Sequence, residues 1–186
     1  MGAGKSEVAR CLEAFGAYII DTDKLAREAV APGSDALREI ARAWPSVMRH
    51  GGLNRGALAE IVFHDPSARE RLNAIVHPHV RRLAAASEAY AKPGQIIVQV
   101  VPLLFETHYD EITDKSILVI APEAQRIARI VQRDGLTEEQ VRARMQAQID
   151  PDEAKKRADY VIENDGNFAS LKERTRAIYE RLAATT

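Results

Sequence analysis

The chain has 186 residues, of which 46% are hydrophobic and 28% are charged, a balance typical of one soluble globular domain. Its 26 basic and 27 acidic residues leave a net charge of −1, which excludes a global field directed at nucleic acid or at a membrane. The single cysteine, Cys11, excludes an internal disulfide and favours the reducing cytoplasm, and no apolar run approaches the ~20 residues of a membrane-spanning helix.

The first residues, Gly2-Ala3-Gly4-Lys5-Ser6, match the second half of the phosphate-loop pattern G-x-x-x-x-G-K-[ST]. In that pattern backbone amides surround the phosphates of a nucleotide, the lysine reaches the phosphate oxygens, and the serine hydroxyl ligates Mg²⁺. The alternative interpretation is a glycine-rich start that only caps a helix.

An amphipathic helix is predicted after this loop. Val8, Leu12 and Phe15 recur at i, i+4 and i+7, and Gly16 can end the helix in the left-handed conformation. This order favours the phosphate loop. The first glycine of the pattern, and the strand that normally feeds the loop, would lie upstream of Met1. Either the chain is truncated or the match is a coincidence.

The apolar run 17–20 predicts a buried parallel strand, and Asp21 and Asp23 follow at its carboxyl end. Ligands of open α/β sheets bind beyond the carboxyl ends of strands, so these acids are well placed for chemistry. Asp23 has a second interpretation as the N-cap of a helix that begins at Lys24, and the two roles are compatible.

Residues 24–91 have a helical pattern with interruptions at Pro32-Gly33, Pro45 and Gly51-Gly52. This stretch is too long for a simple crossover between two strands, so it predicts an inserted helical subdomain that holds a second substrate. His77 precedes Pro78, which predicts a helix boundary at that point. A histidine in such a position is more often packed and hydrogen-bonded than catalytic.

Two further buried strands are predicted at residues 96–101 and 117–120, and the segment from Pro102 to Glu106 after the first of them is a candidate site. The helix that opens near Pro122 carries arginines at i, i+3 and i+7, namely Arg126, Arg129 and Arg133. Such a stripe is either a solvated face or a clamp on transferring phosphates.

The C-terminal part begins with a capping box at residues 137–140, whose helix runs to about Gln148, and Asp150 caps a second short helix. Both helices are highly charged and have little to pack against, so they predict a mobile lid. A last strand at 160–162 precedes an amphipathic helix with Leu171, Ile178 and Leu182. With one strand supplied before Met1, the order predicts a five-stranded parallel sheet wrapped by helices, the α/β fold of a P-loop kinase.

Several segments resemble the dephospho-CoA kinase family in the family's order. They cover nearly the whole chain and are residues 2–6, 20–23, 52–55, 72–78, 101–106, 132–134 and 158–164. The His77-Pro78 and Pro102-Leu103-Leu104-Phe105-Glu106 segments are specific to this family among P-loop kinases. The resemblance implies a three-layer P-loop fold whose first central strand is missing from this chain. It also implies transfer of the γ-phosphoryl group of ATP to the 3′-hydroxyl of dephospho-CoA, with Mg²⁺.

The family implies a role for each matching residue. For catalysis the implied residues are Lys5, Asp23, Arg129 and Arg133, with Asp23 orienting or deprotonating the attacking hydroxyl. For ATP they are Gly2, Ala3, Gly4, Lys5, Ser6 and Glu7 at the phosphates and Asn164 near the adenine. For the acceptor they are Asp23, His77, Pro102, Leu103, Leu104 and Glu106. For Mg²⁺ they are Ser6 and Asp21.

We therefore expect one kinase domain at 1–186, with an acceptor-binding subdomain at 24–91 and a lid at 134–158. Its partner would be dephospho-CoA, with no nucleic acid and no membrane, and the chain would be a monomer or a weak homo-oligomer. The family's Thr-Gly-Gly-Ile run before the loop is absent, and Glu7 replaces a common Thr. We expect an incomplete copy of an active enzyme. The alternatives are another small-molecule or nucleoside-monophosphate kinase, and a non-catalytic nucleotide-binding remnant.

Overall fold

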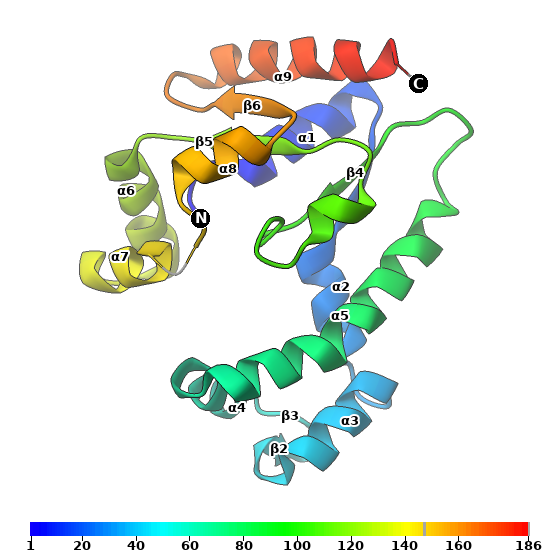
Figure 1. Ribbon diagram of the computed structural model, residues 1–186, viewed down its shortest axis with the longest axis vertical. Helices are drawn as coiled ribbons and strands as arrows, with labels where there is room; N and C mark the ends of the chain where they lie inside the picture. Colours follow the sequence, from blue (N-terminus) through cyan, green and yellow to red (C-terminus); the bar gives the residue numbers. More distant parts are fainter. Residues whose placement is uncertain (147, 186) are drawn as a thin grey trace. The chain divides into compact units, whose positions relative to one another are not determined.

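A computed structural model describes residues 1–146 and 148–185 and shows an alternation of helices and strands (Figure 1). The chain divides into two compact units. The first unit comprises the described residues of Met1–Ile19 and Lys92–Thr186, and the second comprises Ile20–Ala91. No helix in the described part of the chain is long and apolar enough to cross a membrane.

The elements of the first unit are α1 (Lys5–Phe15), β4 (Ile97–Val100), η2 (Tyr109–Ile112), β5 (Ile117–Ile120), α6 (Glu123–Asp134), α7 (Glu138–Gln146), α8 (Pro151–Arg157), β6 (Tyr160–Glu163) and α9 (Phe168–Ala183). Those of the second unit are α2 (Thr22–Ala29), α3 (Asp35–Ala43), η1 (Pro45–Val47), β2 (Met48–Arg49), β3 (Gly52–Leu53), α4 (Arg55–His64) and α5 (Pro66–Glu88). Strand β1 (Tyr18–Asp21) crosses the boundary between the units.

The core of the first unit lies between α1, α9 and the strands. Val8 and Leu12 of α1 are buried in one cluster with Leu171 and Ile178 of α9, which confirms the predicted apolar faces of both helices. Figure 1 shows α9 running beside β6, and both helices pack in this layer. Gly16 ends α1 with a φ of 114°, as predicted.

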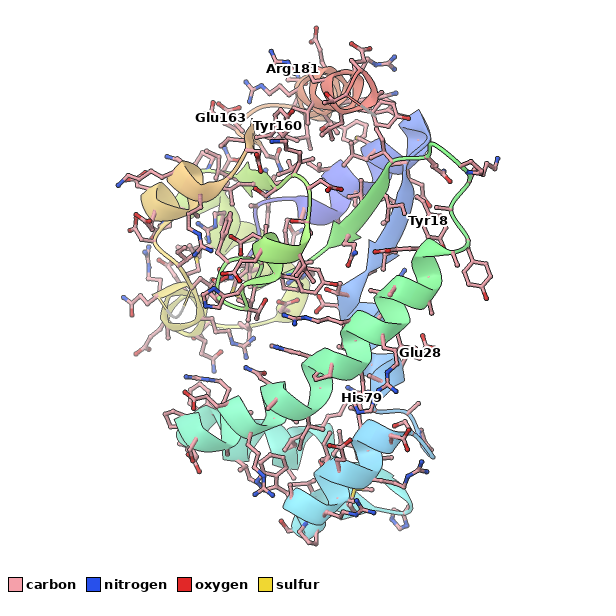
Figure 2. All side chains as sticks on the ribbon, turned by 45° about the vertical axis from the view of Figure 1, so that its right-hand side comes forward. Tyr18, Glu28, His79, Tyr160, Glu163 and Arg181 are labelled. Atoms are coloured by element: carbon pink, nitrogen blue, oxygen red, sulfur yellow. The ribbon has the colours of Figure 1, made fainter. Side chains whose placement is uncertain are left out.

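Strands β5 and β6 form a parallel pair whose register runs from Ile117 opposite Tyr160 to Ile120 opposite Glu163. Figure 2 labels the two end residues of β6, Tyr160 and Glu163. Asp159 fixes the start of this pair, because its Oδ2 accepts hydrogen bonds from the amide and the hydroxyl of Ser116, both at 2.9 Å. The α/β architecture predicted from the order of the elements is therefore present.

The predicted central strand at 96–101 is shorter and more exposed than expected. β4 covers Ile97–Val100, its side chains are mostly half-buried, and Ile97 is 37% exposed. Within the described ranges β4 pairs with β1, where the Tyr18 amide donates to the Ile96 carbonyl at 2.8 Å, and β5 pairs with β6. β4 is therefore shielded less than a strand with neighbours on both sides, which explains the difference.

A short antiparallel hairpin in the second unit was not predicted. β2 and β3 pair Met48 with Leu53 and Arg49 with Gly52. The turn residues His50 and Gly51 both have left-handed backbones, with φ of 49° and 76°, as a two-residue type I′ turn requires. The sequence pattern only indicated an interruption at this place.

The predicted helix boundary at His77-Pro78 is wrong, because α5 runs without a break from Pro66 to Glu88. A proline inside a helix removes one backbone hydrogen bond at a cost of ~3 kcal/mol. Packing offsets this cost, since Ile75 and Val76 contact the buried cluster of this unit before the proline and Val80 is buried after it.

A side-chain hydrogen bond also attaches α5 to α3. His79 on α5, labelled in Figure 2, lies between Glu39 of α3 and Arg82, with ring-nitrogen distances of 3.2 and 2.8 Å. Because arginine can only donate, Nδ1 of His79 accepts from Arg82, and Nε2 is then the nitrogen that donates to Glu39.

The two helices predicted as a lid are α7 and α8. The capping box is confirmed, since Thr137 and Gln140 exchange hydrogen bonds of 3.0 and 3.2 Å, and Asp150 caps α8. α7 ends at Gln146, and residue 147 of the expected lid lies outside the described residues. The expectation that these helices have little to pack against is wrong for α7, because Val141 is 0% exposed in a cluster with α6.

Candidate active site

The loop that enters α1 has an unusual backbone. Gly2 and Gly4 both lie in the left-handed region, with φ of 71° and 99°, and Gly4 is the N-cap of the helix. Among the residues that the structure describes, no side chain forms a capping hydrogen bond at this end of α1. Backbone amides at an uncapped helix start, together with the positive end of the helix dipole, favour binding of an anion.

Only glycine fits at these two positions. A Cβ atom on Gly2 would lie 2.7 Å from the carbonyl oxygen of Arg126, and one on Gly4 would lie 2.2 Å from Nδ2 of Asn164. The loop is therefore pressed between α6 and the residue that follows β6. This close approach gives a physical reason for the glycine spacing that the sequence shows.

Asn164 holds the loop from the end of the sheet. Its backbone amide continues the β5–β6 ladder by donating to the Ile120 carbonyl at 2.7 Å, and its buried side-chain amide donates to the Ala3 carbonyl at 2.8 Å. Arg174 holds the same turn through the Glu163 carbonyl and the Asp165 carboxylate. The sequence indicated Asn164 as a candidate near adenine, whereas its contact with the loop was not predicted.

Two arginines of α6 contact the same loop. Arg126 donates from Nε to the Met1 carbonyl at 2.9 Å, and Arg129 donates from Nη1 to the Gly2 carbonyl at 3.4 Å. Burial lowers the pKa of Arg126 from its ordinary value. Arg133 instead pairs with Asp134 in an exposed position, and this hydrogen bond raises its pKa. The arginine stripe is thus not simply a solvated face.

Positive charge gathers around the loop. The pKa of the Met1 amino group falls to about 5, first because the group is buried and then because Lys5 and Arg126 oppose its charge. Ser6 is exposed on the first turn of α1, and Glu7 pairs with Arg10 of the same helix. The potential at the start of α1 therefore favours an anion such as a phosphate.

The candidate segment from Pro102 to Glu106 begins after the end of β4. Phe105 is buried, whereas Leu103 is 41% exposed and presents apolar surface. Glu106 is exposed and accepts a hydrogen bond of 3.0 Å from the amide of Ile149, the residue before the N-cap of α8. This segment therefore contacts the backbone that leads into the second lid helix, a connection that the sequence did not indicate.

The remaining candidates belong to the second unit. The N-cap of α2 is Asp21 and not Asp23, because Oδ1 of Asp21 accepts from the amides of Asp23 and Lys24 at 3.0 and 3.2 Å. The helix begins earlier than predicted because Asp21, the last residue of β1, still has the extended backbone that an N-cap needs. The carboxylate of Asp23 stands exposed in the first turn of α2.

His77 is half-buried in α5. Burial, and the nearby positive charge of Arg81, lower its pKa from the ordinary value. A lowered pKa keeps the imidazole neutral at pH 7, so this ring can donate one hydrogen bond and accept another.

Comparison of the sequence with known proteins finds the same family in each case. A family model described as dephospho-CoA kinase matches residues 1–170. A dephospho-CoA kinase of Thermobifida fusca (strain YX) is 42% identical over 184 residues, which cover 98% of this chain and 92% of that protein. A dephospho-CoA kinase of Gloeobacter violaceus is 43% identical over 175 residues, covering 92% of this chain and 84% of that protein.

Two solved structures share the fold over nearly the whole chain. TT1252 from Thermus thermophilus is 37% identical with a TM-score of 0.86, and the match covers 98% of this chain and 93% of that one. The dephospho-CoA kinase from Campylobacter jejuni is 26% identical with a TM-score of 0.72, covering 100% and 94% of the two chains.

Proposed function

This chain belongs to the dephospho-CoA kinase family, and from that premise we propose that it transfers the γ-phosphoryl group of ATP to the 3′-hydroxyl of dephospho-CoA. The observation that carries the proposal is the loop at the start of α1. Its left-handed glycines, the contact of Ala3 with Asn164, and the arginines of α6 make a preorganised anion site at a helix start.

The nucleotide side of the site uses residues of the first unit. The backbone amides of the loop would surround the phosphates, and the ammonium group of Lys5 would neutralise the charge that develops on the transferring group. Arg129 and Arg133 would add charge from α6. A single donor of this kind is worth ~2.7–4 kcal/mol of transition-state stabilisation.

Two side-chain oxygens suit Mg²⁺, a cation that prefers hard oxygen ligands. One is the exposed hydroxyl of Ser6, and the other is Oδ2 of Asp21, which lies 4.0 Å from Nζ of Lys24 while Oδ1 caps α2. The described residues contain no group of three or more His, Cys, Asp or Glu side chains that could hold a metal. Mg²⁺ usually keeps waters and phosphate oxygens among its ligands and, when bound, would neutralise phosphate charge.

Acceptor roles are proposed for residues of each unit separately. Asp23 would orient the ribose hydroxyl or take its proton, since its carboxylate is exposed and is not the helix cap. Neutral His77 is the second candidate for acceptor binding in its unit, and the segment from Pro102 to Glu106 is the candidate in the first unit. Leu103 offers apolar surface there, and Leu104 and Glu106 complete the segment.

A coupled assay of ADP formation tests the proposal when it is run with ATP, Mg²⁺ and dephospho-CoA. We expect turnover with dephospho-CoA and almost none with nucleoside monophosphates or other small alcohols. Mass spectrometry should find one added phosphoryl group on the acceptor. The Lys5→Ala variant should lose nearly all activity, because it removes charge at the transferring group.

Two other results would contradict this proposal, and each would identify a different function. Efficient phosphorylation of a nucleoside monophosphate, with dephospho-CoA inert, would identify a different small-molecule kinase. Calorimetric binding of ATP without transfer to any acceptor would identify a non-catalytic nucleotide-binding protein.

A further inference from the structure

One segment of the first unit holds α8 at both of its ends. Before the helix, the amide of Ile149 donates to a carboxylate oxygen of Glu106 at 3.0 Å. At the last residue of the helix, Nη2 of Arg157 donates to Oδ2 of Asp110 at 2.6 Å. The seven residues of α8 span about 10 Å, so residues 103–112, which we call the bracket segment, attach to the helix at two separate points.

Arg157 makes a second contact with the bracket segment. Its guanidinium carbon lies 4.8 Å from the ring centroid of Phe105, a side chain that is almost fully buried. A planar guanidinium can stack on a ring and donate to a carboxylate at the same time, whereas the ammonium group of a lysine cannot reproduce both contacts. The position therefore requires arginine in particular.

Asp110 depends on this arginine. Its side chain is only 17% exposed, and Arg157, 32% exposed, is its ion-pair partner. Its other oxygen, Oδ1, is buried and has no hydrogen-bond partner among the residues that the structure describes. A carboxylate that is removed from water needs a compensating charge, so the present conformation of η2 is tied to Arg157.

We propose that Arg157 is a positioning residue for phosphoryl transfer. Through Asp110 and Phe105 it keeps α8, the second of the lid helices, in fixed contact with the bracket segment. The start of that segment lies at the acceptor side of the site in our proposed function, on which this inference rests. Glu106 links the acceptor segment to α8, because it belongs to that segment and also accepts the hydrogen bond from the backbone before α8.

The kinetic test compares Arg157→Gln with Lys156→Gln. Lys156 is the neighbouring cation of α8, and its ion pair with Glu153 stays within the helix, so its loss leaves the bracket segment untouched. For Arg157→Gln we expect the KM for dephospho-CoA to rise roughly tenfold, the size of an ordinary coupling between contacting residues. The KM for ATP should stay within about twofold, because the phosphate loop keeps its own contacts. Lys156→Gln should resemble the unmodified chain.

A double-mutant cycle identifies the route of the effect. If Arg157 acts through Asp110, then Asp110→Asn should raise the same KM, and the double variant should show much less than the product of the two single effects. Arg157→Lys should recover part of the loss, because it restores the charge but not the stacking on Phe105.

Amide hydrogen exchange tests the attachment without substrate. In Arg157→Gln, exchange should accelerate in residues 107–113 and in α8, while α9 keeps its protection. Unchanged exchange would overturn the attachment. Faster exchange with an unchanged KM for dephospho-CoA would reduce Arg157 to a structural role and overturn the positioning. If the unmodified chain does not phosphorylate dephospho-CoA, the proposed function fails and the positioning with it, whereas the exchange result still decides whether Arg157 attaches α8.

Discussion

Asn164 donates a hydrogen bond of 2.8 Å from its side-chain amide to the carbonyl oxygen of Ala3, although 161 residues separate the two in the sequence. The bond joins the turn after β6 to the loop before α1. Because the backbone amide of Asn164 also extends the β5–β6 ladder, the loop is fixed to the end of the sheet. A loop that is already ordered in the free protein loses less conformational entropy when it binds its ligand, so the ligand binds more tightly.

Asn164→Ala should therefore weaken ATP binding as well as stability. The Ala3 carbonyl would lose its buried donor, at ~1–3 kcal/mol in the free energy of unfolding. The KM for ATP should rise about tenfold if ~1.4 kcal/mol of preorganisation is lost. Kinetics and urea unfolding measure the two effects separately.

Asn167→Ala is the matched control, because Asn167 caps α9 without reaching the loop. It should cost ~1 kcal/mol of stability and leave the KM for ATP unchanged. Equal KM values for both variants would show that the Asn164 contact serves the fold alone.

Gly4→Ala should lower the melting temperature by more than the cost of a left-handed alanine backbone alone explains. A left-handed backbone costs an alanine ~1–2 kcal/mol, and here the new Cβ would also lie 2.2 Å from Asn164. Gly135 has a similar left-handed backbone with a φ of 67°, but an added Cβ would have no described atom within 4 Å beyond its chain neighbours. Gly135→Ala should thus show only the backbone cost. Comparable thermal shifts in the two variants would argue against steric contact at Gly4.

Local patterns predicted much of the fold because their causes lie within a few residues. The i, i+4 spacing of Val8 and Leu12 sufficed for α1, and the capping box at residues 137–140 identified the start of α7. The hairpin at 48–53 was missed, because its strands are two residues long and leave no alternating pattern.

Other features depend on distant residues that a pattern cannot pair. Pro78 indicated a boundary, yet tertiary packing on both sides of it keeps α5 continuous. Arg157 and Asp110 are 47 residues apart, and neither belongs to a motif. In the candidate site the glycine spacing predicted the loop, whereas the contact of Asn164 with Ala3 joins residues that are distant in the sequence and belongs to no local pattern. The catalytic roles of Lys5 and Asp23 stay predictions.

Asp23→Asn should reduce turnover much more than ATP affinity. The substitution keeps the size of the side chain but removes the charge that would attract the proton of the hydroxyl group, an effect of about 10²–10⁴-fold for a general base. Asp65→Asn is the control for loss of an acid at a helix start of the same unit, since Asp65 caps α5 outside the proposed site and asparagine caps helices as well as aspartate. Rapid-quench kinetics measures the turnover, and calorimetry measures the affinity for ATP. An equal loss of turnover and affinity in Asp23→Asn would contradict a role as base.

Asp159 should make the first unit sensitive to acid. Hydrogen bonds from Lys115 and Ser116 lower the pKa of its carboxyl group to about 2. A depressed pKa in the folded state stabilises the protein above the unfolded pKa of ~3.9, and this contribution is lost as the pH falls from there towards about 2. Because the side chain is 35% exposed, solvent screening leaves roughly 1 kcal/mol of the effect.

Urea unfolding between pH 5 and pH 2 measures this contribution. Asp159→Asn should be less stable than the unmodified chain at pH 5, and the difference should shrink as the pH approaches 2, because the carboxyl group then becomes neutral in both states. Asp152→Asn removes an exposed acid that pairs with Lys155 of its own helix, so its effect should be small at every pH. A constant difference between Asp159→Asn and the unmodified chain across this range would mean that packing, and not the charge of Asp159, fixes the start of the β5–β6 pair.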